Sequence, residues 1–326
     1  MTHLSPDPSD PATLAAAIAA GERVAVARGL NLLDDQRPEA QAKAAGLLAA
    51  LPEERLVAGG HLIGLTGPPG VGKSTLSAAL IRHWRGEGLR VGVLAVDPSS
   101  PFSGGAVLGD RLRMVGAEDA GVFVRSLADR GSFGGVSAEA WPMSQILLAA
   151  YDRVLIETVG VGQREIDIAD LADSIVFVAQ PYSGDAIQVI KAGILEVPDI
   201  LVVNKADLGP GARRTLADLS SAIRPAEEAD GWTLTALATS AAAGSGVAEL
   251  AGAIDDHLAW LSRSGRLAAR RRNAPLRWLI SRLVERFGRH GIDRLSGEAA
   301  IAARLGASPV AAFALLGELD HRLRQP

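Results

Sequence analysis

Six short stretches rich in apolar and β-branched residues recur between residues 59 and 260. Most of them are apolar at consecutive positions, so both faces of each predicted strand are expected to be buried. Stretches with helical spacing separate them, and this alternation favours a mainly parallel sheet flanked by helices. The six predicted strands are HLIGLTG (61–67), RVGVLAVD (90–97), DRVLIET (152–158), SIVFVAQ (174–180), DILVVNK (199–205) and WTLTALATS (232–240).

Apolar residues at helical spacing dominate the segments on either side of these strands. The pattern predicts an N-terminal helical cap over residues 1–58, an α/β domain over 59–260 and a C-terminal helical segment over 261–326. Asp10 and Pro11 suit the N-cap and first turn of the first helix. The apolar stripes comprise Leu14, Ala17 and Ile18, then Ala44, Leu47, Leu48 and Leu51, and finally Leu276, Leu279, Ile280, Leu283, Val284 and Phe287.

Composition narrows the class of protein. The chain has a formal net charge of -4, which argues against nucleic-acid binding, and it has no cysteine for disulfides or thiolate zinc sites. No apolar run approaches the ~20 residues that span a bilayer. The first lysine or arginine is Arg23, so the N-terminus lacks the basic region of a secretory signal. We expect a soluble cytoplasmic protein without nucleic-acid or membrane partners.

The segment GPPGVGKST directly follows the first predicted strand and fits the P-loop pattern G-x-x-x-x-G-K-[ST]. Its glycines allow the backbone to turn N–H groups inward around an anion. Lys73 can reach the β- and γ-phosphates, and Ser74, near which a helix is predicted to begin, can offer a hydroxyl to Mg²⁺. A chance glycine-rich turn is the alternative, which the amphipathic stretch TLSAALIRHW disfavours. The predicted phosphate-binding residues are Gly67, Gly70, Val71, Gly72, Lys73, Ser74 and Thr75.

The segment ETVGVGQRE places Glu157 at the C-terminal end of a predicted strand, shortly before the glycines Gly160 and Gly162. A P-loop enzyme needs a carboxylate from a neighbouring strand end to hold Mg²⁺, often through water, and we predict this role for Glu157. An exposed strand-end acid is the alternative. Asp97, which ends another strand, and Asp110, in VLGDRLRM, are further candidate ligands. Without the P-loop, Asp97 would be interpreted as a helix-cap or turn acid, and Asp110 as a solvated loop acid.

The segment NKAD follows the apolar run DILVV and suits a guanine base. Asp207 can accept hydrogen bonds from the ring N–H and the exocyclic amine, donors that adenine does not present together. Asn204 can bind the purine edge and the neighbouring loop, and the stem of Lys205 can pack over the ring. N-K-x-D alone often caps a helix, but after a P-loop and Glu157, each at a strand end, it predicts a GTPase. The predicted base-binding residues are Asn204, Lys205, Asp207, Ser240 and Ala241, of which the last can donate its N–H to guanine O6.

The order of these motifs resembles that of the MeaB/ArgK family of P-loop GTPases. GPPGVGKST, AVDPSSP, LGDRLRM, GGVS, ETVGVGQ, GDAIQVIKAG and VVNKAD follow the family's order over about residues 25–260. The resemblance implies GTP or GDP with Mg²⁺ as ligands. It implies Lys73 and Ser74 at the phosphates and metal, Asp97, Asp110 and Glu157 around Mg²⁺, and Asn204, Lys205 and Asp207 on guanine. It also implies a chaperone for an adenosylcobalamin-dependent acyl-CoA mutase, such as methylmalonyl-CoA mutase, and a C-terminal dimerisation arm in a homodimer.

One position departs from Ras-type GTPases, which place a water-orienting glutamine directly after the glycine of the Glu157 element. Here Val161 occupies it, and the nearest glutamine is Gln163. The resemblance makes residues 181–193 a third switch that faces the mutase. We predict slow hydrolysis by the chain alone and faster hydrolysis with the partner. The predicted catalytic residues are Lys73, Gln163, Asp185 and Lys191.

Two other functions stay open from the sequence. A metallochaperone GTPase of the nickel-insertion kind shares the fold, but it usually carries His-rich or Cys-containing clusters, whereas the six histidines here are scattered singly. A kinase or ATPase supporting basic amino-acid transport is the family's older label, and NKAD argues against ATP. The chain lacks a D-x-H-x-x-G motif, so direct cobalamin binding is not expected.

Overall fold

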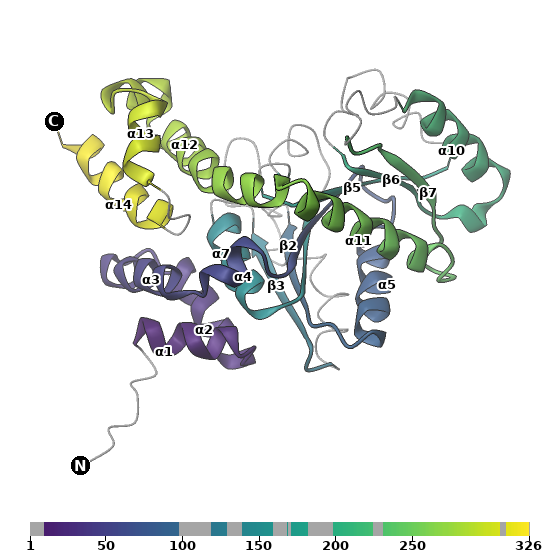
Figure 1. Ribbon diagram of the computed structural model, residues 1–326, viewed down its shortest axis with the longest axis horizontal. Helices are drawn as coiled ribbons and strands as arrows, with labels where there is room; N and C mark the ends of the chain where they lie inside the picture. The colour runs from purple at the N-terminus through teal and green to yellow at the C-terminus, as the bar shows by residue number, and fades with distance from the viewer. Residues whose placement is uncertain are drawn as a thin grey trace, which may run out of the picture. The chain divides into compact units, whose positions relative to one another are not determined.

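The fold contains a seven-stranded sheet in which all neighbouring strands are parallel (Figure 1). The computed structural model describes residues 10–97, 119–128, 139–158, 168, 171–181, 198–223, 231–306 and 311–325. The strand order is β3-β2-β4-β1-β5-β6-β7. The strands are β1 (His61–Thr66), β2 (Val91–Asp97), β3 (Val122–Ala128), β4 (Arg153–Thr158), β5 (Ser174–Ala179), β6 (Ile200–Val203) and β7 (Thr235–Ala238). The predicted parallel α/β sheet is therefore confirmed.

The strand β3 was not among the six predicted strands. Among the described strands it pairs only with β2, and it forms an edge of their sheet. Its sequence, VFVRSLA, is interrupted by Arg125 and Ser126. An edge strand needs less apolar surface than a central one, so β3 lacks the continuous apolar run that predicts a buried strand.

Helices cover both faces of the sheet, as continuous burial of the central strands requires. Every residue of β1, β5 and β6 is buried. Val176 and Val178 of β5 share a core cluster with residues of α5 (Lys73–Gly86) and α11 (Val247–Arg263). The alternate residues Phe177 and Ala179 pack with α10 (Pro210–Ala222) on the other face. The period-two alternation of β5 thus assigns α5 and α11 to one layer and α10 to the other.

The remaining helices form a second compact unit. By their contacts, Met1–Gly60, Ala138–Tyr151 and Ala268–Pro326 make up this helical unit, and His61–Ser137 with Asp152–Leu267 make up the sheet unit. The predicted division into residues 1–58, 59–260 and 261–326 stays a prediction. The helices are α1 (Pro11–Ala19), α2 (Arg23–Asp34), α3 (Pro38–Ala50), α4 (Glu53–Val57), α7 (Ala140–Ala150), α12 (Arg266–Arg294), α13 (Glu298–Leu305) and α14 (Ala311–Arg324).

The start of the first helix in the helical unit agrees with the prediction from the sequence. Asp10 accepts a hydrogen bond from the backbone N–H of Thr13 at 2.9 Å, and Pro11 begins α1, as predicted. The long helix α12 is interrupted at Gly288, whose φ of 66° is not helical. Arg271 of α12 is buried, and its guanidinium donates to the carbonyl oxygens of Leu56, Gly59 and Gly60. Among the described residues, none of the helices is both long and apolar enough to cross a bilayer.

Candidate functional site

A glycine-rich loop leads from β1 into α5, with positive φ angles of 138° at Gly67 and 92° at Gly72. A Cβ added to Gly67 would lie 2.1 Å from the carbonyl oxygen of Val178, and one added to Gly72 would lie 2.6 Å from Asn204 Nδ2. Neighbouring strand ends therefore leave room only for glycine at both positions. The helix begins at Lys73, one residue before the predicted start. The loop forms the cradle that the P-loop pattern predicts.

The side chain of Lys73 folds back over this loop. Its Nζ donates to the carbonyl oxygen of Gly67 at 2.7 Å and to that of Pro68 at 2.9 Å. The residue is only 6% exposed. The charge of this lysine is thus held at the loop by acceptors that belong to the loop itself. Val71, in the same loop, is fully buried in the core, and Thr75 is half-buried.

The carboxylate of Glu157 is held by two hydroxyl groups of α5. Ser74 Oγ donates to Oε1 at 2.5 Å and Ser77 Oγ donates to Oε2 at 2.8 Å. Glu157 is 1% exposed, so the alternative of an exposed strand-end acid is wrong. The sequence interpretation missed Ser77. Its signal was the spacing of three from Ser74, which puts both hydroxyls on one face of a helix.

The oxygen atoms around Glu157 suit Mg²⁺, which prefers carboxylate and hydroxyl oxygens. Of the four predicted metal ligands, the structure brings Ser74 and Glu157 together. The backbone of Asp97 ends β2, whose Val96 pairs with Thr158 of β4, but its side chain is outside the described part of the chain. Asp110 is outside the described residues altogether.

The NKAD segment is tied to the P-loop through Asn204 and Lys205. Asn204 is buried, and its Nδ2 donates to the carbonyl oxygen of Val71 at 2.9 Å. Lys205 has a left-handed φ of 59°, and its Nζ donates to the carbonyl oxygen of Gly70 at 2.7 Å and to Gln180 Oε1 at 2.9 Å. These bonds fix the position of the predicted base-binding loop relative to the predicted phosphate-binding loop.

The loop after β7 completes this arrangement. Ser240 Oγ donates to Asp207 Oδ1 at 2.5 Å, which orients an otherwise exposed carboxylate. Asn204 Oδ1 accepts from the Ala241 backbone N–H at 3.1 Å and from Thr239 Oγ1 at 3.2 Å. The Ala241 N–H that was predicted for guanine O6 is thus bonded to Asn204 here. Thr239 is fully buried and was missed by the sequence interpretation.

Three predicted catalytic residues, Gln163, Asp185 and Lys191, lie outside the described residues, as does Val161. Their roles stay predictions.

Two of the histidines that look scattered in sequence are joined in the sheet unit. His61 Nε2 lies 2.7 Å from Ser174 Oγ, which lies 2.6 Å from His257 Nδ1. His257 Nε2 in turn lies 3.3 Å from Asp199 Oδ1. His61, Ser174 and His257 are fully buried. Since His61 and Ser174 are the first residues of β1 and β5, this chain of contacts lies at the opposite edge of the sheet from the P-loop.

Comparisons with known proteins agree with this arrangement of loops. The family model described as Methylmalonyl Co-A mutase-associated GTPase MeaB matches residues 26–292. A protein of Pyrococcus horikoshii named as a GTPase is 46% identical over 257 residues, 77% of this chain and 79% of that protein. GTPase ArgK of Escherichia coli is 37% identical over 276 residues, 83% of this chain and 82% of ArgK.

One solved structure extends the likeness to the whole fold. The crystal structure of LAO/AO transport system kinase has a TM-score of 0.69 and 28% sequence identity, and the match covers 98% of this chain and 100% of that one. The chain therefore belongs to the MeaB/ArgK family of P-loop GTPases.

Proposed function

We propose that the loops at the C-terminal edge of the sheet form the GTP site, and that hydrolysis there controls the loading and protection of an adenosylcobalamin-dependent acyl-CoA mutase. The observation that carries the site assignment is the contact of Asn204 with Val71, because it joins the NKAD loop to the P-loop. The family description, which names methylmalonyl-CoA mutase, supports the choice of partner.

The phosphates are bound by the backbone N–H groups of Gly67–Thr75 and by Lys73. The ammonium group of Lys73 now donates to two loop carbonyls, and phosphate oxygens can replace those acceptors without unfolding the loop. The N-terminus of α5 adds its dipole to the same place. The negative charge that develops on the transferred phosphoryl group is thereby stabilised by groups already in position.

Ser74 and Glu157 are the residues of the described chain that would hold Mg²⁺, with Asp97 and Asp110 as further proposed ligands. When bound, Mg²⁺ neutralises charge on the β- and γ-phosphates. Ser77 keeps one carboxylate oxygen of Glu157 hydrogen-bonded, so that Ser74 is free to turn from the carboxylate to the metal. Glu157 is therefore oriented whether or not the metal is present.

Guanine is selected by Asp207, which accepts from the ring N–H and the exocyclic amine. Ser240 holds this carboxylate by one oxygen. Asn204 holds the NKAD loop in place, and the stem of Lys205 packs over the base. The Ala241 N–H, which donates to Asn204 Oδ1 here, donates to guanine O6 when the nucleotide is bound.

We propose that partner control rests on Gln163, Asp185 and Lys191, which stabilise the developing charge when the mutase is bound. Unassisted hydrolysis is then slow, on the order of 10⁻⁴ to 10⁻² s⁻¹ by analogy with other GTPases. A coupling of ~1–3 kcal/mol between nucleotide state and mutase binding is enough for a usable gate. The C-terminal helices are proposed to form the dimerisation arm of a homodimer.

The test is single-turnover GTP hydrolysis with and without a purified adenosylcobalamin-dependent acyl-CoA mutase. We expect the mutase to accelerate hydrolysis by the wild-type chain, and Asp185→Ala and Lys191→Ala to lose most of that acceleration. Arg214→Ala, an exposed position on α10, is the control and should keep it. Equal rates with and without the mutase would leave a GTPase whose partner is of another kind.

A kinase is the second candidate function, because the matched crystal structure carries that description. A kinase would transfer the phosphoryl group to an acceptor other than water and need not prefer guanine. Measuring nucleotide preference and the release of inorganic phosphate separates it from the GTPase. Phosphate release from GTP in preference to ATP, without a second substrate, excludes the kinase.

A further inference from the structure

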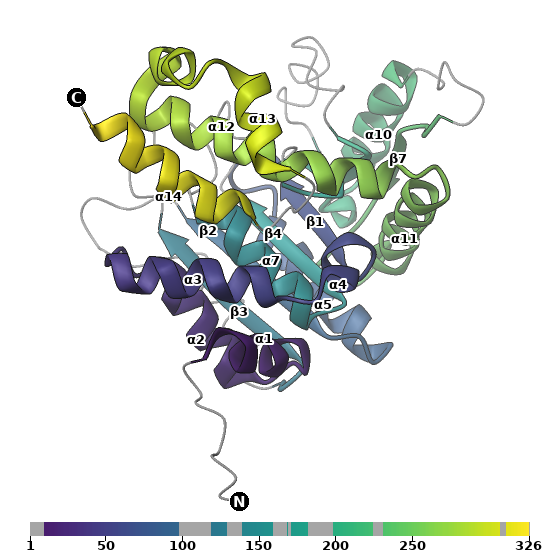
Figure 2. The same ribbon diagram turned by 60° about the vertical axis from the view of Figure 1, so that its left-hand side comes forward.

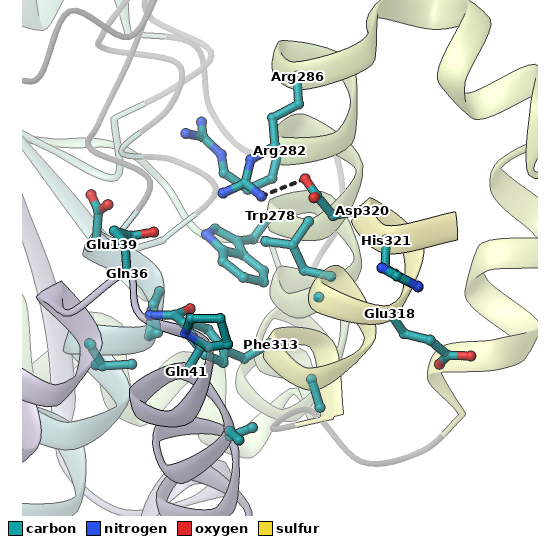
Figure 3. A pocket seen from close by; sticks show the side chains of 18 of the residues that line it. Gln36, Gln41, Glu139, Trp278, Arg282, Arg286, Phe313, Glu318, Asp320 and His321 are labelled. Carbon is teal, nitrogen blue, oxygen red and sulfur yellow. Dashed lines mark hydrogen bonds and ion pairs between the residues drawn. The ribbon is translucent and has the colours of Figure 1, made fainter. Parts of the chain in front are cut away.

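The helical unit contains a cavity of about 850 Å³. Its walls come from α2 and α3, the start of α7, and the C-terminal helices α12 and α14 (Figure 3). This volume lies within the ~300–1,000 Å³ that is typical of small-molecule sites. The residues proposed to bind GTP do not line it. The cavity is therefore a separate place at which a ligand can bind.

Two aromatic rings belong to the lining of the cavity. The rings of Trp278 and Phe313 are nearly parallel, at an interplanar angle of 13° with centroids 6.2 Å apart. Trp141, which is itself buried, packs against Trp278 at 4.9 Å and fixes its position. Figure 2 shows α7, α12 and α14, the helices that supply these rings. Flat apolar ligands pack well on such rings.

A buried arginine beside these rings has unused hydrogen-bonding capacity. Arg282 is 6% exposed, its Nη1 lies 2.5 Å from Glu285 Oε2, and its Nη2 donates to Ser281 Oγ at a long 3.4 Å. Its Nε is buried and has no hydrogen-bond acceptor among the described residues. In Figure 3, Arg282 and Arg286 lie on the same side of Trp278. A buried N–H without an acceptor is uncommon, and guanidinium groups match carboxylate and phosphate oxygens in geometry.

The carboxylates of the lining are mostly engaged elsewhere. Asp320 accepts from Arg286 at 2.8 Å and from Arg324 at 2.5 Å. Burial alone raises the pKa of Asp320, but the hydrogen bonds from Arg324 and Arg286 outweigh it and hold that pKa below its ordinary value. Asp320 is thus an ionised group shared by two cations.

The other two acids of the lining lie on other elements than Arg282, which belongs to α12. Glu318 is paired with Arg304, which does not line the cavity, at 2.6 Å. Glu139 lies at the start of α7. A bound anion would therefore be directed to the α12 side of the cavity, at Arg282, and away from Glu139.

We propose that this cavity binds a small organic anion, with a flat apolar group on Trp278 and Phe313 and a carboxylate or phosphate at Arg282. The anion supplies the acceptor that the Nε of Arg282 lacks. The apolar group displaces water from the aromatic surface, which is favourable in proportion to the area covered. Ligand binding here does not require the nucleotide.

The probes are 2-naphthoate, 2-naphthyl phosphate and the neutral 2-naphthamide, titrated calorimetrically into the full-length chain. Because hydrogen bonds to charged groups are the stronger ones, we expect at least one anion to bind about 10-fold more tightly than the amide. The tighter of the two anions identifies carboxylate or phosphate as the group recognised. Arg282→Gln should remove the preference for the anion, whereas Trp278→Leu should weaken binding of all three probes.

Arg289→Gln is the matched control. It breaks the exposed ion pair of Arg289 with Glu298, which lies outside the cavity, and should leave all three affinities unchanged. Circular dichroism verifies that each variant is folded. The proposal is overturned by equal affinities of the anions and the amide, by an unchanged preference in Arg282→Gln, or by no binding of either anion at millimolar concentration.

Discussion

At the scale of single residues, the carboxylate of Glu157 explains how a buried charge is tolerated next to a phosphate site. A buried carboxylate is costly unless its oxygens accept hydrogen bonds, and here each oxygen accepts one from a serine of α5. The two serines differ in what we propose for them. Ser74 can leave Glu157 for Mg²⁺, whereas Ser77, one turn further along the helix, can only hold the carboxylate in place.

Ser77→Ala should therefore weaken the response to Mg²⁺ more than it weakens nucleotide binding. Partners that orient a metal ligand contribute about 10- to 100-fold to metal affinity or activity, and we expect a rise of that order in the Mg²⁺ concentration for half-maximal GTP hydrolysis. Ser77→Thr, which keeps the hydroxyl, should restore most of the response. GTP binding measured without Mg²⁺ is the control and should change little. An unchanged Mg²⁺ profile in Ser77→Ala would show that Glu157 does not depend on this bond.

The sequence could name Ser74 and Glu157 but not the second serine. The P-loop pattern specifies residues by their spacing along the chain, and Ser77 lies outside it. Its role depends on β4 running beside β1, since only then does Glu157 reach α5. Thr239 was missed for the same reason, because its bond to Asn204 joins two different strand ends.

At the scale of elements, Ser174 joins three parts of the sheet unit. It begins β5, contacts His61 at the start of β1, and contacts His257 on α11. The ring of His257 also lies 4.7 Å from Trp232 and 5.4 Å from Trp260. A hydroxyl at this point satisfies polar atoms that would otherwise be buried without partners. We infer that it contributes to the stability of the sheet, far from the proposed GTP site.

Ser174→Ala should lower the free energy of unfolding by about 1–3 kcal/mol, because two buried histidine nitrogens lose a partner. Ser262→Ala is the control: Ser262 is an exposed residue of α11 whose hydroxyl bonds to the carbonyl oxygen of Leu258 in its own helix. Urea unfolding followed by tryptophan fluorescence measures both variants. Equal stabilities of the two variants would mean that the buried contacts of Ser174 contribute nothing net.

The elements themselves were predictable where burial is continuous and less so where it is not. All residues of β1, β5 and β6 are buried, and their apolar runs were found. The edge strand β3 carries Arg125 and Ser126 and was not predicted. The inclusion of α7 in the helical unit could not be predicted either. All residues of α7 are buried, so its sequence has no single apolar face from which its packing partners could be inferred.

At the scale of the whole molecule, the parallel sheet explains why motifs far apart in sequence meet. The carboxyl ends of parallel strands lie at one edge, which is where ligands bind in such sheets. The P-loop follows β1, Glu157 lies near the end of β4, and the NKAD segment follows β6. The order of these motifs could be identified from the sequence, whereas the hydrogen bonds that join their loops depend on the folded sheet.

A ligand that binds only the folded chain raises its unfolding temperature, so the base preference can be measured on the whole molecule. At a GTP concentration of 100 times the dissociation constant, the stabilisation is about 2.7 kcal/mol, a shift of several degrees. Asp207→Asn replaces a guanine acceptor with an amide that complements xanthine. We expect this variant to lose most of the shift with GTP and to gain one with XTP, while ATP shifts neither protein.

Because Asp207 is exposed, its variant should unfold at the wild-type temperature when no nucleotide is present. Lys73→Ala is the complementary variant: it should show no shift with any of the nucleotides, since Lys73 is proposed to meet the phosphates and not the base. Differential scanning calorimetry in Mg²⁺ measures all three proteins with GTP, XTP and ATP. A full GTP shift in Asp207→Asn would remove Asp207 from the base site. If that variant loses the shift with GTP and gains none with XTP, the substitution damaged the loop and did not exchange its specificity.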